Sequence, residues 1–375
     1  MRLPRTIAKL KAVPSLVAGL AKGVASGNTK LTALDAPFDN PGGLDASMFV
    51  PEGLAPGAPL VVVLHGCTQS AADYDGGSGW SRLAARHGFA LLYPQQTRRN
   101  NPNLCFNWFQ PRDTRRGQGE VASIQAMVEA MCVRHRLDRT RVFVTGLSAG
   151  GAITAAMLAT YPETFAAGAI IAGIPYGCAS GVGEALECMA GRNGPVSDAA
   201  LGDRVRAASP HTGRWPRVSV WHGSADSTVV PGNGDAVARQ WADVHGLPAT
   251  PTTTEIADGQ VRSLWADANG AVVLEHYAIA GLGHGTPLRP GTEPGQSGAA
   301  RAHMLDAGIS STDRIAAFFG VGPAVVDRGH GTAKTTEVPA ARIATKVANP
   351  NRPIAAAAGP QKVIEDALRA AGLMR

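Results

Sequence analysis

Short apolar runs alternate with longer helical patterns along most of the chain. Six runs rich in Val, Ile and Leu predict strands at residues 59–66, 89–94, 141–146, 167–173, 217–223 and 272–281. Helical patterns lie between some of them, at 79–88, 119–135 and 150–162, and each ends at Gly, Pro or a basic residue. Apolar strands joined by helices are typical of a mostly parallel sheet that is covered by helices on both faces. The pattern therefore predicts an α/β fold.

The two ends of the chain depart from this pattern. Residues 1–32 begin with positive charges, but Lys9, Lys11 and Lys22 interrupt the apolar run that a secretion signal needs. We expect a basic, amphipathic arm there. Residues 321–375 are rich in Ala and Pro and contain one short predicted helix at 362–373. We therefore expect an N-terminal arm at 1–32, one folded domain at 33–320, and a C-terminal tail at 321–375.

Composition limits the classes of partner. The chain has 375 residues, of which 45% are hydrophobic and 17% are charged, so it can bury a large core. Its net charge of +6 is mild, and the basic residues are scattered without interleaved aromatic residues. This argues against a nucleic-acid partner. No stretch reaches the roughly 20 uninterrupted apolar residues of a transmembrane helix, so we expect no integral membrane segment.

A G-x-S-x-G sequence runs from Gly146 to Gly150, between a predicted strand and a predicted helix. That context is the one in which such a serine acts as a nucleophile. The two glycines would let the backbone turn sharply, so that the Ser148 hydroxyl stands above the carboxyl edge of the sheet. A helix N-terminus beneath it would favour developing negative charge. A glycine-rich turn in which Ser148 only caps the helix is the structural alternative.

A nucleophilic serine needs a histidine base and a carboxylate that orients the base, in the chain order Ser, Asp or Glu, His. His284 is the favoured base, because it lies in a glycine-rich loop after the last strong strand; His303 is the second choice. Asp226, in the loop after the strand at 217–223, is the favoured acid. The remaining candidates sit in less suitable places: His222 at a strand end, Glu275 inside a strand, Asp235 at a helix start and Asp203 in a polar connector.

An oxyanion hole in this architecture combines two backbone N–H groups. Ala149 supplies the first, because it follows the serine directly. Cys67 is the expected second donor, because it follows the His65–Gly66 end of an early buried strand. A plain loop would also explain Gly66.

Several segments together resemble the polyhydroxybutyrate depolymerase family of esterases: "LHGCTQSAADYD", "NNPNLCFNWF", "VFVTGLSAGGAI", "HGSADSTVVPGN" and "GLGHGTP". The resemblance covers about 33–320. It implies an α/β-hydrolase fold, a Ser148–Asp226–His284 triad, and Cys67 in the oxyanion loop. It also implies that no metal or organic cofactor is used, and that the substrates are carboxylic esters of short hydroxyacids.

The resemblance leaves the substrate and the compartment open. The family also includes feruloyl and acetyl-xylan-type esterases, and an acyltransferase or a non-catalytic binder of polymer granules are further alternatives. The family is regarded as extracellular, whereas the unclear signal at residues 1–32 keeps a cytoplasmic protein as the alternative. The tail resembles neither the linker nor the polymer-binding domain of secreted depolymerases. We therefore expect a catalytic domain alone, with weak action on crystalline polymer.

Aromatic and cysteine residues complete the predicted site. Trp80, Phe106, Trp108 and Phe109 could line the substrate groove, although core packing would also explain each of them. The five cysteines are an odd number, too few for a disulfide scaffold. The expected pairs are Cys178–Cys188, which flank a Gly/Ala-rich loop, and more weakly Cys67–Cys105, both in loops near the site; Cys132 is expected to be a buried free thiol.

Overall fold

The computed structural model describes residues 30–324. The helix predicted at 362–373, and most of the predicted arm and tail, lie outside the described residues. The strands are β1 Thr32–Ala33, β2 Asp45–Phe49, β3 Leu60–Leu64, β4 Ala90–Gln95, β5 Val142–Leu147, β6 Ala167–Ile171, β7 Arg217–Gly223, β8 Thr253–Ala257, β9 Gln260–Ala266, β10 Val272–Ile279, β11 Thr286–Leu288 and β12 Met304–Asp306. The helices are α1 Ala71–Ser78, α2 Trp80–His87, α3 Pro111–Thr114, α4 Gly119–His135, α5 Ala149–Thr160, α6 Val182–Met189, α7 Asp198–Arg206, α8 Gly232–Val244 and α9 Ser311–Phe319.

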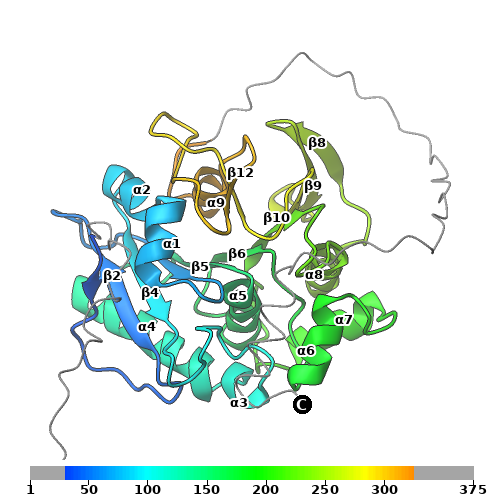
Figure 1. The fold of residues 1–375 in the computed structure, drawn as a ribbon, viewed down its shortest axis with the longest axis horizontal. Helices are drawn as coiled ribbons and strands as arrows, with labels where there is room; N and C mark the ends of the chain where they lie inside the picture. The colour runs from blue at the N-terminus through cyan, green and yellow to red at the C-terminus, as the bar shows by residue number, and fades with distance from the viewer. Residues whose placement is uncertain (1–29, 325–375) are drawn as a thin grey trace, which may run out of the picture.

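A 10-stranded sheet runs through the molecule in the order β1-β2-β4-β3-β5-β6-β7-β10-β9-β8 (Figure 1). The pairs from β4 through β3, β5, β6 and β7 to β10 are parallel, and the pairs at both ends of the sheet are antiparallel. Helices cover both faces of this sheet. The prediction of a mostly parallel sheet between two helical layers, the α/β-hydrolase fold, is confirmed.

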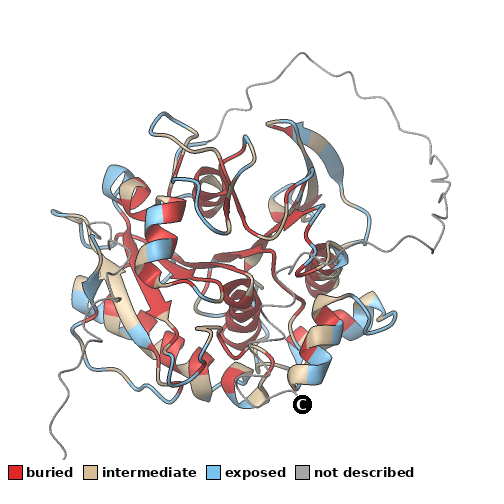
Figure 2. Ribbon diagram, viewed as in Figure 1, coloured by how far each residue is buried: buried red, intermediate tan, exposed pale blue. Residues whose placement is uncertain are grey.

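The two faces of the sheet follow from strand geometry, because successive side chains of a strand point to opposite sides. In β3, Leu60, Val62 and Leu64 belong to the core that also contains residues of α4, α5 and α8. Val61 and Val63 belong to a second core, shared with α1, α2 and α9. Helix α5 is buried along its whole length and lies at the centre of the molecule, as Figure 2 shows. A helix that is apolar on all sides can be stable only in such a place.

Elements at the edges of the fold were not predicted. Strands β2, β8 and β9 lie outside the parallel part of the sheet and are partly exposed, so they lack the continuous apolar run that marks a buried strand. One smaller expectation was wrong, because Asp203 lies in α7 and not in a connector. Asp235 lies in the first turn of α8, as expected of a residue at a helix start.

The parallel strands place four loops at one edge of the sheet. Because β3, β5, β7 and β10 run in the same direction, the loops that follow them leave from the same edge. These loops begin near Cys67, Ser148, Asp226 and His284. Ligands of open α/β sheets bind at this edge. Between residues 30 and 324, no helix combines the length and the apolar character that a bilayer crossing needs.

Candidate active site

Ser148 lies on a sharp turn between β5 and α5. Its φ of 56° and ψ of −116° are unfavourable for a residue with a side chain, and its N–H donates to the carbonyl of Ile171 at 2.9 Å. The flanking glycines make the turn sterically feasible. A Cβ at Gly146 would lie 2.4 Å from the Gly150 carbonyl oxygen, and a Cβ at Gly150 would lie 2.4 Å from the Leu64 carbonyl oxygen. Close backbone approach therefore explains both glycines of the motif.

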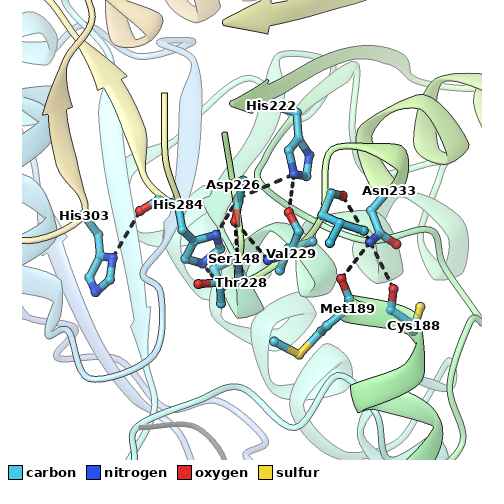
Figure 3. Close-up of polar contacts among 11 residues, drawn as sticks. Ser148, Cys188, Met189, His222, Asp226, Thr228, Val229, Asn233, His284 and His303 are labelled. Atoms are coloured by element: carbon cyan, nitrogen blue, oxygen red, sulfur yellow. Dashed lines mark hydrogen bonds and ion pairs between the residues drawn. The ribbon is translucent and has the colours of Figure 1, made fainter. Parts of the chain in front are cut away.

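Three side chains from three loops form one chain of hydrogen bonds (Figure 3). His284 Nε2 lies 2.8 Å from Ser148 Oγ, and His284 Nδ1 lies 2.7 Å from Asp226 Oδ2. A carboxylate only accepts, so the Nδ1 proton of His284 is donated to Asp226 and Nε2 is left as an acceptor for the serine hydroxyl. This is the arrangement that a serine nucleophile and its base need.

Asp226 is buried, yet its surroundings favour the ionised form. The backbone N–H groups of Thr228 and Val229 both donate to Oδ1 at 2.9 Å, and His222 Nε2 lies 3.5 Å from Oδ2 (Figure 3). Burial alone would raise the pKa of Asp226, but hydrogen bonds from His222, His284 and Val229 hold it well below its ordinary value. A permanent negative charge therefore faces the His284 ring.

The alternative site residues have other partners. His303 Nδ1 lies 3.2 Å from the backbone carbonyl oxygen of His284, so His303 contacts the main chain of the loop and not Ser148. His222 Nε2 lies 2.8 Å from the carbonyl oxygen of Val229, behind Asp226. Glu275 is buried in β10, where it pairs with Arg262 at 2.5 Å. None of these three side chains has a contact with the serine hydroxyl in the described chain.

Cys67 and Ala149 lie beside Ser148 in the wall of one cavity. In the described chain, neither backbone N–H donates to another protein group. The neighbouring Gly66 carbonyl oxygen is held by the His65 ring, with 2.7 Å to Nδ1. Because C=O and N–H point in opposite directions across a trans peptide, this contact directs the Cys67 N–H away from His65. Two unused N–H groups beside a serine are the components of an oxyanion hole.

The lining of the cavity beside Ser148 combines polar and apolar side chains. The polar ones include Thr68, Asn101 and Asn103. The apolar ones are more numerous: Trp108, Phe109, Ile174, Val182, Ala185, Leu186, Met189 and Val229. None of the lining residues is charged. Such a cavity suits a neutral, largely apolar ligand with a few polar groups.

The expectation that Trp80 and Phe106 line the groove is wrong. Trp80 is 1% exposed and packs edge-on against Phe89 in the core beneath α2. Phe106 is fully buried, and its ring centroid lies 4.9 Å from that of His65. Large aromatic rings stabilise the fold most when they are removed from water, and both rings are buried in the core. Trp108 and Phe109 do line the cavity.

Both expected cysteine pairs are bonded in the structure. Cys67 is joined to Cys105, which ties the loop after β3 to the loop that carries Trp108. Cys178 is joined to Cys188, which closes the loop before α6 onto that helix. Cys132 is free and buried on α4, and burial raises the pKa of its thiol to about 11. Both disulfides therefore fix segments that contribute residues to the cavity lining.

Removing the Cys178–Cys188 bond should weaken substrate binding more than turnover. A bridge that closes so short a loop stabilises a fold by about 3 kcal/mol. In the double variant Cys178→Ser/Cys188→Ser we expect that loss, because α6 is no longer tied to the chain before it. We also expect KM for a butyryl ester to rise roughly fivefold, about 1 kcal/mol of binding. Chemical denaturation and steady-state kinetics measure both effects.

Cys132→Ala is the matched control, because it also removes a buried sulfur but lies far from α6 in sequence and outside the cavity lining. It should lower stability and leave KM unchanged. An unchanged KM in the double variant would show that the disulfide does not order the α6 residues that line the cavity.

Sequence reasoning missed several residues of the cavity. Helix α6 contributes Val182, Ala185, Leu186 and Met189, but its segment is short and lies between glycines, so no long periodic pattern marked it. Asn101 and Asn103 lie in the segment NNPNLCFNWF. Their position in the loop after the strand predicted at 89–94 could have indicated that they line the site. In residues 30–324, no three His, Cys, Asp or Glu side chains are grouped so that they could hold a metal ion.

The comparisons with known proteins agree on an esterase family. The family model described as "Esterase PHB depolymerase" matches residues 44–263. The poly(3-hydroxyalkanoate) depolymerase C of Paucimonas lemoignei is 47% identical over 286 residues, which cover 75% of this chain and 68% of that protein. Feruloyl esterase B of Talaromyces stipitatus is 32% identical over 268 residues, which cover 68% of this chain and 72% of that protein.

A solved structure supports the same conclusion for the fold. The acetyl xylan esterase from Aspergillus awamori superposes with a TM-score of 0.63 at 29% identity, and the match covers 68% of this chain and 93% of that one. The protein is thus a carboxylic ester hydrolase with the α/β-hydrolase fold. By its family match and its close relative, the chain belongs to the polyhydroxybutyrate depolymerase family of esterases.

Proposed function

We propose that Ser148, His284 and Asp226 are the catalytic triad of this esterase. The observation that carries the proposal is the unbroken hydrogen-bond chain from Ser148 Oγ through His284 to Asp226, with distances of 2.8 and 2.7 Å. The strained backbone of Ser148 supports it, because such strain persists at sites where geometry matters for function. Cys67 and Ala149 are the proposed oxyanion donors.

The reaction proceeds in two acyl transfers. Ser148 Oγ bonds to the ester carbonyl carbon while its proton passes to His284 Nε2, and the N–H groups of Cys67 and Ala149 stabilise the oxyanion. The bond to the alcohol then breaks, and His284 returns the proton to the departing oxygen. In the second half, His284 takes a proton from water as the water attacks the acyl carbon. When that intermediate collapses, the bond between the acyl carbon and Ser148 Oγ breaks and His284 returns the proton to Oγ, which releases the acid and restores the serine hydroxyl.

We propose a short, neutral hydroxyacyl ester of the hydroxybutyrate type as the substrate. The lining of the cavity supports this, because it lacks charged side chains and combines many apolar side chains with a few polar ones. A hydroxybutyrate unit has methyl and methylene groups for the apolar side chains and ester oxygens for the polar ones. The relative named as a poly(3-hydroxyalkanoate) depolymerase points to the same substrate class. The relatives named feruloyl esterase and acetylxylan esterase define the alternatives.

Initial rates on three soluble substrates would test this choice. We expect kcat/KM for a hydroxybutyrate trimer to exceed that for methyl ferulate by about 100-fold, since a mismatch between the rigid aromatic acyl group and a pocket suited to a short acyl chain costs about 1–3 kcal/mol. Acetylated xylo-oligosaccharide should also be a poor substrate, because its bulk lies on the alcohol side. Equal rates on the trimer and the ferulate would contradict the choice. Adding an acceptor alcohol separates hydrolysis from acyl transfer, because only a transferase would form mainly the new ester.

We further propose that residues 33–320 form the catalytic domain and that the protein acts outside the cytoplasm. Two disulfides support the second proposal, because such bonds persist in oxidising compartments. Peptide mapping of the protein isolated without reductant tests it. Recovery of Cys67, Cys105, Cys178 and Cys188 as free thiols would contradict it and favour the cytoplasm.

A further inference from the structure

A buried carboxyl group lies behind the proposed oxyanion loop. Glu120, in the first turn of α4, is fully buried and forms no salt bridge in the described chain. Its oxygens accept hydrogen bonds from three donors: Gln96 Nε2 at 2.5 Å, Asn107 Nδ2 at 2.8 Å and the Asn107 N–H at 2.9 Å. Burying a carboxyl group without a neighbouring cation lowers the stability of a protein, because the group loses its hydration.

A contribution to stability does not explain why a glutamate is buried at position 120. Burial, and next to it the charge of Asp113, raise the pKa of Glu120 to about 8, although the three hydrogen bonds act in the opposite direction. The hydrogen bonds therefore offset only part of the desolvation. An apolar side chain of similar size would fill the same space without the cost of burying a polar group.

The partners of Glu120 lead to the oxyanion loop by two routes. In the first, the Gln96 amide that Glu120 holds also donates to the Cys105 carbonyl oxygen at 3.0 Å, and Cys105 is bonded to Cys67. In the second, the Gln96 backbone N–H donates to His65 Nε2 at 3.1 Å. That contact leaves the proton on His65 Nδ1, which the Gly66 carbonyl oxygen accepts. Both routes end at the Gly66–Cys67 peptide.

We propose that Glu120 is a positioning residue for the oxyanion hole: through Gln96 it holds the Cys67 N–H in the direction that the developing oxyanion requires. The proposal rests on the proposed role of Cys67. Preorganised donors stabilise an oxyanion because they need not reorient during the reaction, and removal of one donor costs about 100-fold to 1000-fold in kcat. Glu120 touches neither the substrate cavity nor Ser148, so its effect is transmitted through the loop.

Glu120→Gln is the primary test. The variant keeps the shape of the side chain but replaces one oxygen, which can accept a hydrogen bond whether or not the carboxyl group is protonated, with an NH₂ group that cannot accept from the N–H groups of Asn107 or Gln96. On p-nitrophenyl butyrate we expect kcat per active site, counted from the acyl-enzyme burst, to fall at least about tenfold. KM should stay within about twofold, because the oxyanion forms only in the transition state.

Ser123→Ala is the matched control. Ser123 is also fully buried on α4, one turn after Glu120, but its Oγ accepts from the Gly42 N–H at 2.8 Å and has no link to the oxyanion loop. We expect a lower melting temperature with kcat within about twofold of the wild type. Comparing Glu120→Gln with Ser123→Ala thus separates an effect on stability from an effect on the orientation of the Cys67 N–H.

An unchanged kcat per titrated site in Glu120→Gln would overturn the proposal, as would an equal loss of kcat in Ser123→Ala. If Glu120→Gln does not fold, Gln96→Met provides the test, because it removes the amide between Glu120 and Cys105 but keeps the backbone contact to His65. A normal kcat in that variant would also overturn the proposal. Failure of the triad proposal would look different, because it would appear as activity in Ser148→Ala.

Discussion

Replacing Ser148 with alanine is expected to lower kcat for p-nitrophenyl butyrate by about a million-fold, the loss seen when the nucleophile of a serine hydrolase is removed. No other hydroxyl is hydrogen-bonded to His284 in the described chain, so the base would have no nucleophile to activate. The fold should persist, since the turn at this position depends on the flanking glycines. Circular dichroism and the melting temperature establish that the variant is folded.

Ser197→Ala is a suitable control for this experiment. Ser197 caps α7 by accepting from the Ala200 N–H at 3.2 Å, and it does not line the cavity. Its loss should cost about 1 kcal/mol of stability with no loss of turnover. Substantial activity in a folded Ser148→Ala protein would rule out the proposed nucleophile.

Asp226→Asn should produce the second-largest loss, about 10,000-fold in kcat. The backbone N–H groups of Thr228 and Val229 both donate to one oxygen of Asp226, so an asparagine would keep its oxygen there. Its NH₂ group would then face His284 Nδ1. To accept that bond, His284 must carry its proton on Nε2, and in this tautomer it cannot accept the serine proton. The protein should remain folded, because shape and packing are nearly unchanged.

His303→Asn is the control that distinguishes the two candidate bases. His303 hydrogen-bonds to the main chain of the His284 loop, and its ring lies edge-on to the His284 ring with the centroids 6.0 Å apart, but it is not hydrogen-bonded to Ser148 or Asp226 in the described chain, so we expect a loss of no more than about tenfold. Measuring kcat at saturating substrate for His303→Asn and Asp226→Asn distinguishes the two candidate bases. A loss in His303→Asn as large as in Asp226→Asn would mean that the assignment of the base is wrong.

The sequence does not indicate which aromatic side chains line the cavity. Trp80, Phe106 and Trp108 have the same kind of side chain and lie in segments near the site, yet the first two are buried in the cores and only Trp108 lines the cavity. Whether a ring packs inward or faces the ligand depends on the space left by helices from distant parts of the chain. No local pattern contains that information. The same holds for helix α6, whose apolar face became a wall of the cavity.

The sequence by itself determined the central strands, the order of the loops at their carboxyl ends, and the glycines around Ser148. These features are local: an apolar run of strand length and a glycine at a position with no room for Cβ can be recognised from neighbouring residues. The tertiary structure alone decided which side chains from different loops come into contact at the carboxyl edge of the sheet. Asp226 and His284 are 58 positions apart in the sequence, and Ser148 and His284 are 136 apart; they meet only because parallel strands bring their loops to one edge of the sheet. The contacts of Glu120 with Gln96 and Asn107 arise in the same way, because a buried carboxyl group takes whichever donors the packed loops present to it.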